Sequence, residues 1–234
     1  MEAEALAEQS APERSHRRTQ IASDWAKLLW VFVLMSILGL LGETLQHRIA
    51  FNEWESRAGL VWGPFSPIYG LAAVLLTIFL EPFSEKGLAP LFVIAALVGG
   101  GLEFIASWAM ETFWGVVAWS YLEIPFNLAG RTDLFHACIW GALGVCWVRV
   151  GLPIVEFLFD KVGTERRGFR IVSGLLAVFM VANIVTTLIA MDRADSRANG
   201  IPAQSPMDQY YDAHYPDEFL QDRFENMGGL GIGS

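Results

Sequence analysis

The stretch Ala89-Pro-Leu-Phe-Val-Ile-Ala-Ala-Leu-Val-Gly-Gly-Gly-Leu-Glu-Phe-Ile-Ala-Ser-Trp-Ala-Met-Glu-Thr-Phe113 decides the fold class of this chain. A helix needs about 20 mostly apolar residues to cross a hydrocarbon core about 30 Å thick, and this stretch is longer than that. Four similar blocks lie around it, at 26–46, 65–82, 134–159 and 169–191. The sequence therefore predicts an all-α, polytopic bundle of about five transmembrane helices.

The composition supports a membrane-embedded chain. Hydrophobic residues make up 53% of the 234 residues and charged residues only 18%, against about 25% charged in soluble domains. The net charge of −9 arises largely in the last forty or so residues and therefore says little about the membrane body. We expect the lipid bilayer as a partner and no nucleic acid.

Three regions follow from the distribution of polar residues. Residues 1–24 are polar and predict a disordered cytoplasmic leader, because no small-residue cleavage site follows the first apolar block. Residues 25–191 are the predicted bundle, and residues 192–234 form an acidic, largely flexible tail. Within that tail, 216–227 is the stretch most compatible with a short helix.

The distribution of Lys and Arg predicts the orientation, because these residues are enriched on the cytoplasmic side. If successive connections lie on alternate sides of the membrane, nine Lys and Arg residues fall on one side and five on the other. The side with more Lys and Arg is predicted to be cytoplasmic. The N-terminus then lies inside, and the connections 47–64 and 114–133 and the C-terminus lie outside. The nine are Arg14, Arg17, Arg18, Lys27, Lys86, Lys161, Arg166, Arg167 and Arg170, and the five are Arg48, Arg57, Arg131, Arg193 and Arg197.

Polar residues within the third block recur at helical spacing. Ala95, Gly99, Glu103, Ser107 and Glu111 are four apart, which keeps them near one face of a helix. Small residues allow a neighbouring helix to approach closely, and carboxylates within a span usually face protein or a watery cavity. The stripe therefore predicts a tight helix contact at one end and a polar site at the other.

Further polar residues fall at the same predicted depth. We expect an outward-facing polar pocket whose candidate binding residues are Glu43, Glu103, Ser107, Glu111, Tyr121, Asn127, Arg131 and His136. Structural ion pairs are the alternative for Glu43, Glu111 and Arg131, which sit near helix ends, where charge costs less. A simple hydrogen-bonding role is the alternative for His136. No ligand spacing such as HExxH is present, so we expect no metal and no cofactor.

Two connections are unusually rich in Gly, Pro and aromatic residues, which predicts loops that fold back and cap the bundle. One is Gly59–Gly70 and the other Trp119–Arg131; ordinary turns into a span are the alternative. The positions we expect to shape these loops are Gly63, Pro64, Pro67, Tyr69, Gly70, Pro125, Phe126 and Gly130.

These motifs resemble a known family. Gly63-Pro-Phe-Ser-Pro-Ile-Tyr-Gly70, Pro125-Phe-Asn-Leu-Ala-Gly-Arg131, the pattern from Leu102-Glu103 to Phe113 and Gly42-Glu43 are similar to those of the CmpB-type ABC-transporter permease family, bacterial multi-pass proteins of uncharacterised function. The resemblance covers about residues 30–150. It implies a transport permease of the bacterial plasma membrane and a separate nucleotide-binding subunit. The family usually has Trp-Asp-Tyr-Ser where this chain has Trp119-Ser-Tyr-Leu122.

Other functions stay open on the sequence alone. The chain has no Walker A motif and therefore no P-loop ATPase of its own. A small intramembrane enzyme using Glu103, Glu111 and His136 for acid–base work is one alternative. A lipid-binding or regulatory membrane subunit is another. The sequence does not specify a substrate.

Overall fold

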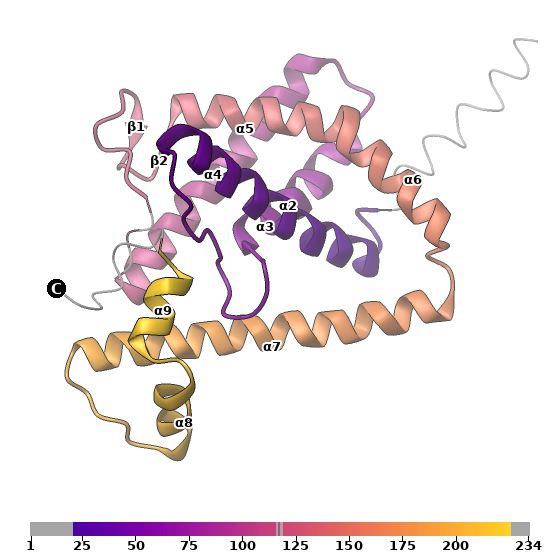
Figure 1. Ribbon diagram of the computed structural model, residues 1–234. Helices are drawn as coiled ribbons and strands as arrows, with labels where there is room; N and C mark the ends of the chain where they lie inside the picture. Colours follow the sequence, from indigo (N-terminus) through magenta and orange to yellow (C-terminus); the bar gives the residue numbers. More distant parts are fainter. Residues whose placement is uncertain (1–20, 116, 118, 226–234) are drawn as a thin grey trace, which may run out of the picture.

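The computed structural model describes residues 21–115, 117 and 119–225, and these are mainly helical (Figure 1). Residues 1–20 of the expected leader lie outside the described residues. The helices are α2 (Trp25–Phe51), α3 (Pro67–Leu80), α4 (Leu88–Trp114), α5 (Leu134–Cys146), α6 (Leu152–Val162), α7 (Arg167–Ala198), α8 (Pro206–His214) and α9 (Asp217–Arg223), with a 3-10 turn at Glu81–Phe83 and a π-helical turn at Trp147–Gly151. The strands β1 (Asn127–Leu128) and β2 (Thr132–Asp133) form a small antiparallel hairpin.

Four helical segments are long and apolar enough to cross a membrane: Trp25–Phe51, Leu88–Phe113, Leu134–Val162 and Arg167–Ala198. Their outer faces carry exposed apolar side chains such as Leu38, Leu97, Leu175 and Val178. An apolar surface of this extent is typical of contact with lipid. The expectation of an all-α membrane bundle is confirmed.

The second predicted span is a shorter apolar helix, Pro67–Phe83 including its 3-10 turn. Near its start, the Tyr69 hydroxyl donates to Glu43 in the second half of α2 at 2.8 Å. Near its end, in the 3-10 turn, the Glu81 carboxylate accepts a hydrogen bond from the backbone N–H of Ala22, just before α2, at 2.9 Å. The segment therefore runs antiparallel to α2 over most of the depth that α2 covers.

The long helical segment from α5 through α6 changes direction around the π-helical turn Trp147–Gly151, which ends two residues before Pro153 (Figure 1). A proline without an N–H inside a helix is a common cause of such a bend. Arg149 in this turn donates to the carbonyl oxygens of Ser84 and Lys86 at 2.9 and 2.7 Å. It therefore ties the bend to the connection between α3 and α4, at the end of the bundle opposite Glu43.

Two helix pairs, α2 with α3 and α4 with α5, form the centre of the bundle. Glycine permits close approach in both. A Cβ on Gly39 would overlap the Tyr69 ring, and a Cβ on Gly99 would overlap the Trp140 ring. A Cβ on Gly144 would overlap Ala95. The small end of the α4 stripe thus packs directly against α5.

The two helix pairs repeat the same contacts, although the sequence shows no evident internal repeat. Phe32, Gly39 and Glu43 on α2 each have a counterpart sixty positions later, Phe92, Gly99 and Glu103 on α4. On the partner helices, Tyr69-Gly70 corresponds to Trp140-Gly141, because Gly70 meets the Phe32 ring as Gly141 meets the Phe92 ring. The chain therefore contains two similar helix hairpins, each with a glutamate four residues after its contact glycine.

Helix α7 lies along one side of these hairpins and continues to Ala198, beyond the predicted end of the bundle (Figure 1). Residues 206–225 then differ from the expected flexible tail, because α8 and α9 fold back onto the end of α7. Leu220 and Phe224 are buried beside Ala190 and Ala194 of α7 and Val61 of the first loop. This apolar cluster compensates for ordering an otherwise polar segment.

Candidate functional site

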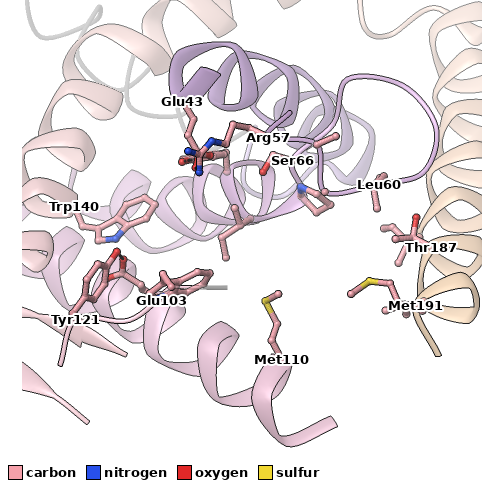
Figure 2. Close-up of a pocket in the computed structure, with 18 residues that line it drawn as sticks. Glu43, Arg57, Leu60, Ser66, Glu103, Met110, Tyr121, Trp140, Thr187 and Met191 are labelled. Atoms are coloured by element: carbon pink, nitrogen blue, oxygen red, sulfur yellow. Dashed lines mark hydrogen bonds and ion pairs between the residues drawn. The ribbon is translucent and has the colours of Figure 1, made fainter. Parts of the chain in front are cut away.

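A cavity of about 450 Å³ lies where α2, α3, α4, α5, α7 and the two long loops meet (Figure 2). All of these elements contribute from the same end of the bundle, the end at which Glu43 meets Tyr69. The walls are largely apolar and aromatic, with a few polar groups directed inward. Among the lining residues are Glu43, Arg57, Leu60, Ser66, Tyr69, Glu103, Met110, Trp119, Tyr121, Trp140, Thr187 and Met191.

Glu43 forms the first polar group at the cavity. It accepts a hydrogen bond from the Tyr69 hydroxyl at 2.8 Å and faces the guanidinium of Arg57 at 3.4 Å. Arg57 comes from the loop after α2 and also pairs with Glu55 at 2.7 Å. The Glu43 carboxylate therefore has its counter-charge within the protein.

Glu103 forms the second polar group and is only 8% exposed. One carboxylate oxygen accepts from the Tyr121 hydroxyl and the other from the Thr132 hydroxyl, both at 2.8 Å. Tyr121 lies in the loop after α4, and Thr132 lies in β2 just before α5. Two neutral donors from the second loop thus hold a carboxylate of the third predicted span in place.

Tyr121 is itself held by its neighbours. Its ring stacks on His136 with centroids 4.1 Å apart, and His136 Nδ1 lies 2.5 Å from Asp133 Oδ2. Burial raises the pKa of the Tyr121 phenol well above its ordinary value, and the nearby Glu103 carboxylate raises it further. The phenol therefore stays protonated and available as a donor to Glu103.

Asp133 anchors the start of α5. Its side chain accepts from the backbone N–H groups of Phe135 and His136, as an N-cap does. Burial acts to raise the pKa of this carboxyl, but the hydrogen bonds from the side chain and backbone of His136 and from Phe135 outweigh it, and the pKa lies below its ordinary value. His136 thus supports the site from behind Tyr121 and does not line the cavity.

Asn127 shapes the second loop and does not reach the cavity. Its amide nitrogen donates to the carbonyl oxygens of Leu122 and Ile124, and its amide oxygen accepts from the N–H of Gly130. Phe126 and Gly130 have φ of 59° and 68°, in the left-handed region that glycine tolerates and phenylalanine adopts at a cost. The Pro125–Arg131 motif therefore builds a tight turn that presents Tyr121 and Thr132 to Glu103.

The first loop motif has a comparable structural task. Gly63 has a φ of 71°, and Pro67 begins α3, where its missing N–H costs little. Gly70 allows α3 to lie directly on Phe32 of α2. Ser66 and Tyr69 are the hydroxyl-bearing members of this motif, and both line the cavity.

The remaining predicted site residues form a separate group. Arg131 pairs with Glu111 at 2.5 Å and lies 3.4 Å from the Ser107 hydroxyl. None of these three lines the cavity. Of the eight candidate residues, the structure places Glu43, Glu103 and Tyr121 around one cavity, with His136 behind Tyr121 and the other four outside.

Several lining residues were not singled out in the sequence. Arg57, Trp119 and Trp140 are polar or aromatic side chains at the cavity, and Met110, Thr187 and Met191 complete it from α4 and α7. Trp140 follows His136 by four residues and was therefore detectable from helical spacing. Arg57 was not, because its position depends on the course of a long loop.

The described part of the chain contains no group of three or more His, Cys, Asp or Glu side chains arranged to hold a metal ion.

The fold and this cavity define the protein as a multi-pass, α-helical membrane protein with a partly polar site at one end of its bundle. Residues 30–188 match the model of the family described as "Putative ABC-transporter type IV", ABC_trans_CmpB. The chain therefore belongs to this family, as the loop motifs predicted. Comparison with curated proteins and with solved structures gave no match.

Proposed function

We propose that the chain is the membrane-spanning permease component of an ABC-type transport system, and that the cavity is the place where its cargo is held. The cavity carries this proposal. It brings Glu43, Glu103 and Tyr121 from separate elements around a space of about 450 Å³, which lies in the range of small-molecule sites. Its largely apolar walls with a few directed polar groups are also typical of such sites.

The proposed orientation places the cavity on the outer side of a bacterial plasma membrane. The Lys and Arg distribution supports it, since the opposite end of the bundle carries Lys27, Lys86, Lys161 and Arg170. At that end Arg170 holds Asp24 with two hydrogen bonds of 2.8 and 2.7 Å. A cargo site facing outward suits a component that receives its ligand from outside the cell.

A separate nucleotide-binding subunit is the expected partner, because this chain contains no Walker A motif. Its docking surface would be the cytoplasmic connections 84–87 and 163–166. Arg149 stiffens the first of these by binding the carbonyl oxygens of Ser84 and Lys86. A stiff connection can transmit movement of a docked subunit to α3 and α4.

The test is copurification after crosslinking in intact membranes, so that detergent does not strip a weak partner. A tagged full-length chain is purified in mild detergent and its partners are identified by mass spectrometry. A nucleotide-binding subunit in stoichiometric amount, absent from an unrelated tagged multi-pass protein, is the expected result. Recovery of the chain without any ATPase after crosslinking would overturn the transporter assignment.

A further inference from the structure

The charge of Glu103 has no counter-ion among the residues that the structure describes. Its two oxygens accept hydrogen bonds from the hydroxyls of Tyr121 and Thr132, which are both neutral donors. Arg57 lines the same cavity but pairs with Glu43 and Glu55, and Arg131 pairs with Glu111 further along α4. A carboxylate that is buried without a cation is costly, and this one borders a cavity.

The repeated hairpin provides an internal comparison. Glu43 occupies the equivalent position on α2, and Arg57 supplies its positive charge from the following loop. After α4, the corresponding loop supplies Tyr121 instead of a cation. In the first hairpin a cation, shared with Glu55, therefore faces the glutamate, whereas in the second the described residues place two hydroxyl donors on it.

The walls near Glu103 suit a cation that also has an apolar body. Trp119, Tyr121 and Trp140 line the cavity together with Tyr69, and aromatic faces attract organic cations. Met110 and Met191 line the side toward α7, and methionine adapts to irregular apolar shapes. Figure 2 shows Glu103 beside Tyr121, with Trp140 directed toward the same space.

We propose that the cavity binds a small organic cation, with its positive charge held by Glu103 and its apolar body held by the aromatic and methionine walls. The ligand completes the second hairpin as Arg57 completes the first. This inference names the cargo class of the proposed transport function and rests on it. An inorganic cation would gain little from the aromatic and methionine walls, which make up most of the surface.

The decisive test compares a cation with its neutral isostere on the unmodified protein. The full-length chain in lipid nanodiscs is titrated calorimetrically with choline, with the larger benzyltrimethylammonium and with 3,3-dimethyl-1-butanol, in which carbon replaces the nitrogen of choline. We expect both cations to bind at least about tenfold more tightly than the neutral alcohol. Equal affinities, or no binding of either cation at millimolar concentration, would overturn the inference.

Two matched variants locate the charge. Glu103→Gln should weaken binding of benzyltrimethylammonium by about tenfold or more, whereas Glu111→Gln, outside the cavity and paired with Arg131, should stay within about twofold. Unchanged binding by Glu103→Gln would show that this carboxylate carries a proton and not the ligand's counter-charge, and would overturn the assignment. If that variant does not fold, the isostere comparison decides alone.

The outcomes separate this inference from the transport proposal. Cation-selective binding without a copurifying ATPase would retain the site and remove the transporter assignment. A copurifying ATPase with equal binding of cation and isostere would retain the transporter and remove the cargo class.

Discussion

At the scale of single residues, the structure gives different tasks to glycines that look alike in the sequence. A Cβ on Gly70 would overlap the hydroxyl of Ser36 and the backbone carbonyl oxygen of Phe32, whereas a Cβ on Gly42 would meet nothing within 4 Å. The first glycine sets the distance between α2 and α3. The second has no such packing role.

This difference makes a direct prediction. Gly70→Ala should lower stability by about 1–3 kcal/mol, because the backbone of α2 cannot yield as a flexible side chain does. Gly42→Ala in the same helix pair should be neutral or slightly stabilising, by up to about 1 kcal/mol, since alanine favours a helix. The thermal midpoints of the two purified variants, compared with the unmodified protein, test this. Equal changes in thermal midpoint for the two variants would show that the missing side chain at position 70 does not set the distance between α2 and α3.

The two glutamates of the repeat should also respond differently. Glu103→Gln should impair ligand binding more than Glu43→Gln, because Glu43 already has Arg57 as a counter-charge, whereas the donors to Glu103 in the described part of the chain are neutral hydroxyls. We expect a loss of about tenfold against a few-fold loss for benzyltrimethylammonium. Parallel titrations of both variants measure it. An equal or larger loss for Glu43→Gln would reject Glu103 as the principal charge of the site.

At the scale of elements, ion pairs and an apolar cluster hold the C-terminal helices on α7. Asp212 of α8 binds Arg193 and Arg197 of α7 at 2.8 and 2.6 Å. From α9, Arg223 donates to the carbonyl oxygen of Leu60 at 2.9 Å, and Leu60 lines the cavity. The docked helices therefore support the loop that forms one cavity wall.

Docking of α8 should depend on pH in the acidic range. Hydrogen bonds from Arg193 lower the pKa of Asp212 below its ordinary value of 3.8; burial opposes this and Arg197 reinforces it. A lowered pKa stabilises the docked state above pH 3.8, and this contribution is lost as pH falls below that value. Cleavage of residues 206–223 by pepsin, an acid-active protease, should therefore rise steeply below about pH 4.

Matched variants test the origin of that pH dependence. Asp212→Asn should weaken docking by about 1–3 kcal/mol and flatten the profile, because the titrating group is gone. The exposed Asp222→Asn should retain the profile of the unmodified protein. A steep profile that persists in Asp212→Asn would assign the effect to another carboxylate.

At the scale of the whole molecule, the number of crossings depends on α3. Five crossings place residues 53, 123 and 222 on one side of the membrane and residues 86 and 165 on the other. Single cysteines at these positions, in a chain without Cys138 and Cys146, can be labelled with a membrane-impermeant maleimide. We expect Glu53→Cys, Glu123→Cys and Asp222→Cys to react in intact cells, and Lys86→Cys and Glu165→Cys only after permeabilisation. Reaction of positions 53 and 86 from the same side would show that α3 does not cross.

The sequence predicted the fold class because apolar length is a property of consecutive residues. The blocks 26–46, 89–113, 134–159 and 169–191 lie within helices that are long enough to cross a membrane. The stripe of residues spaced four apart on the third block was likewise readable, and its Gly99 packs on Trp140 of the next helix. The loop motifs predicted the family, whose model matches residues 30–188.

The candidate site was only partly readable, because its residues come from segments far apart in the chain. Glu103 and Tyr121 were chosen for polarity at a predicted depth, but the cavity also needs Arg57, Trp140 and Met191. Arg131 seemed equally suitable by depth, yet it lies with Glu111 outside the cavity. Depth along a helix follows from position in the sequence, whereas the direction a loop residue takes does not.

The sequence by itself determined the membrane location, the helical spans and the family, because each depends on local composition or on contiguous motifs. Only the tertiary structure decided that two hairpins repeat the same glycine and glutamate contacts and that α8 and α9 pack on α7. It also decided that, among the described residues, Glu43 faces a counter-ion and Glu103 accepts from two neutral hydroxyls. These features depend on distances between residues remote in sequence, which packing and loop closure set together.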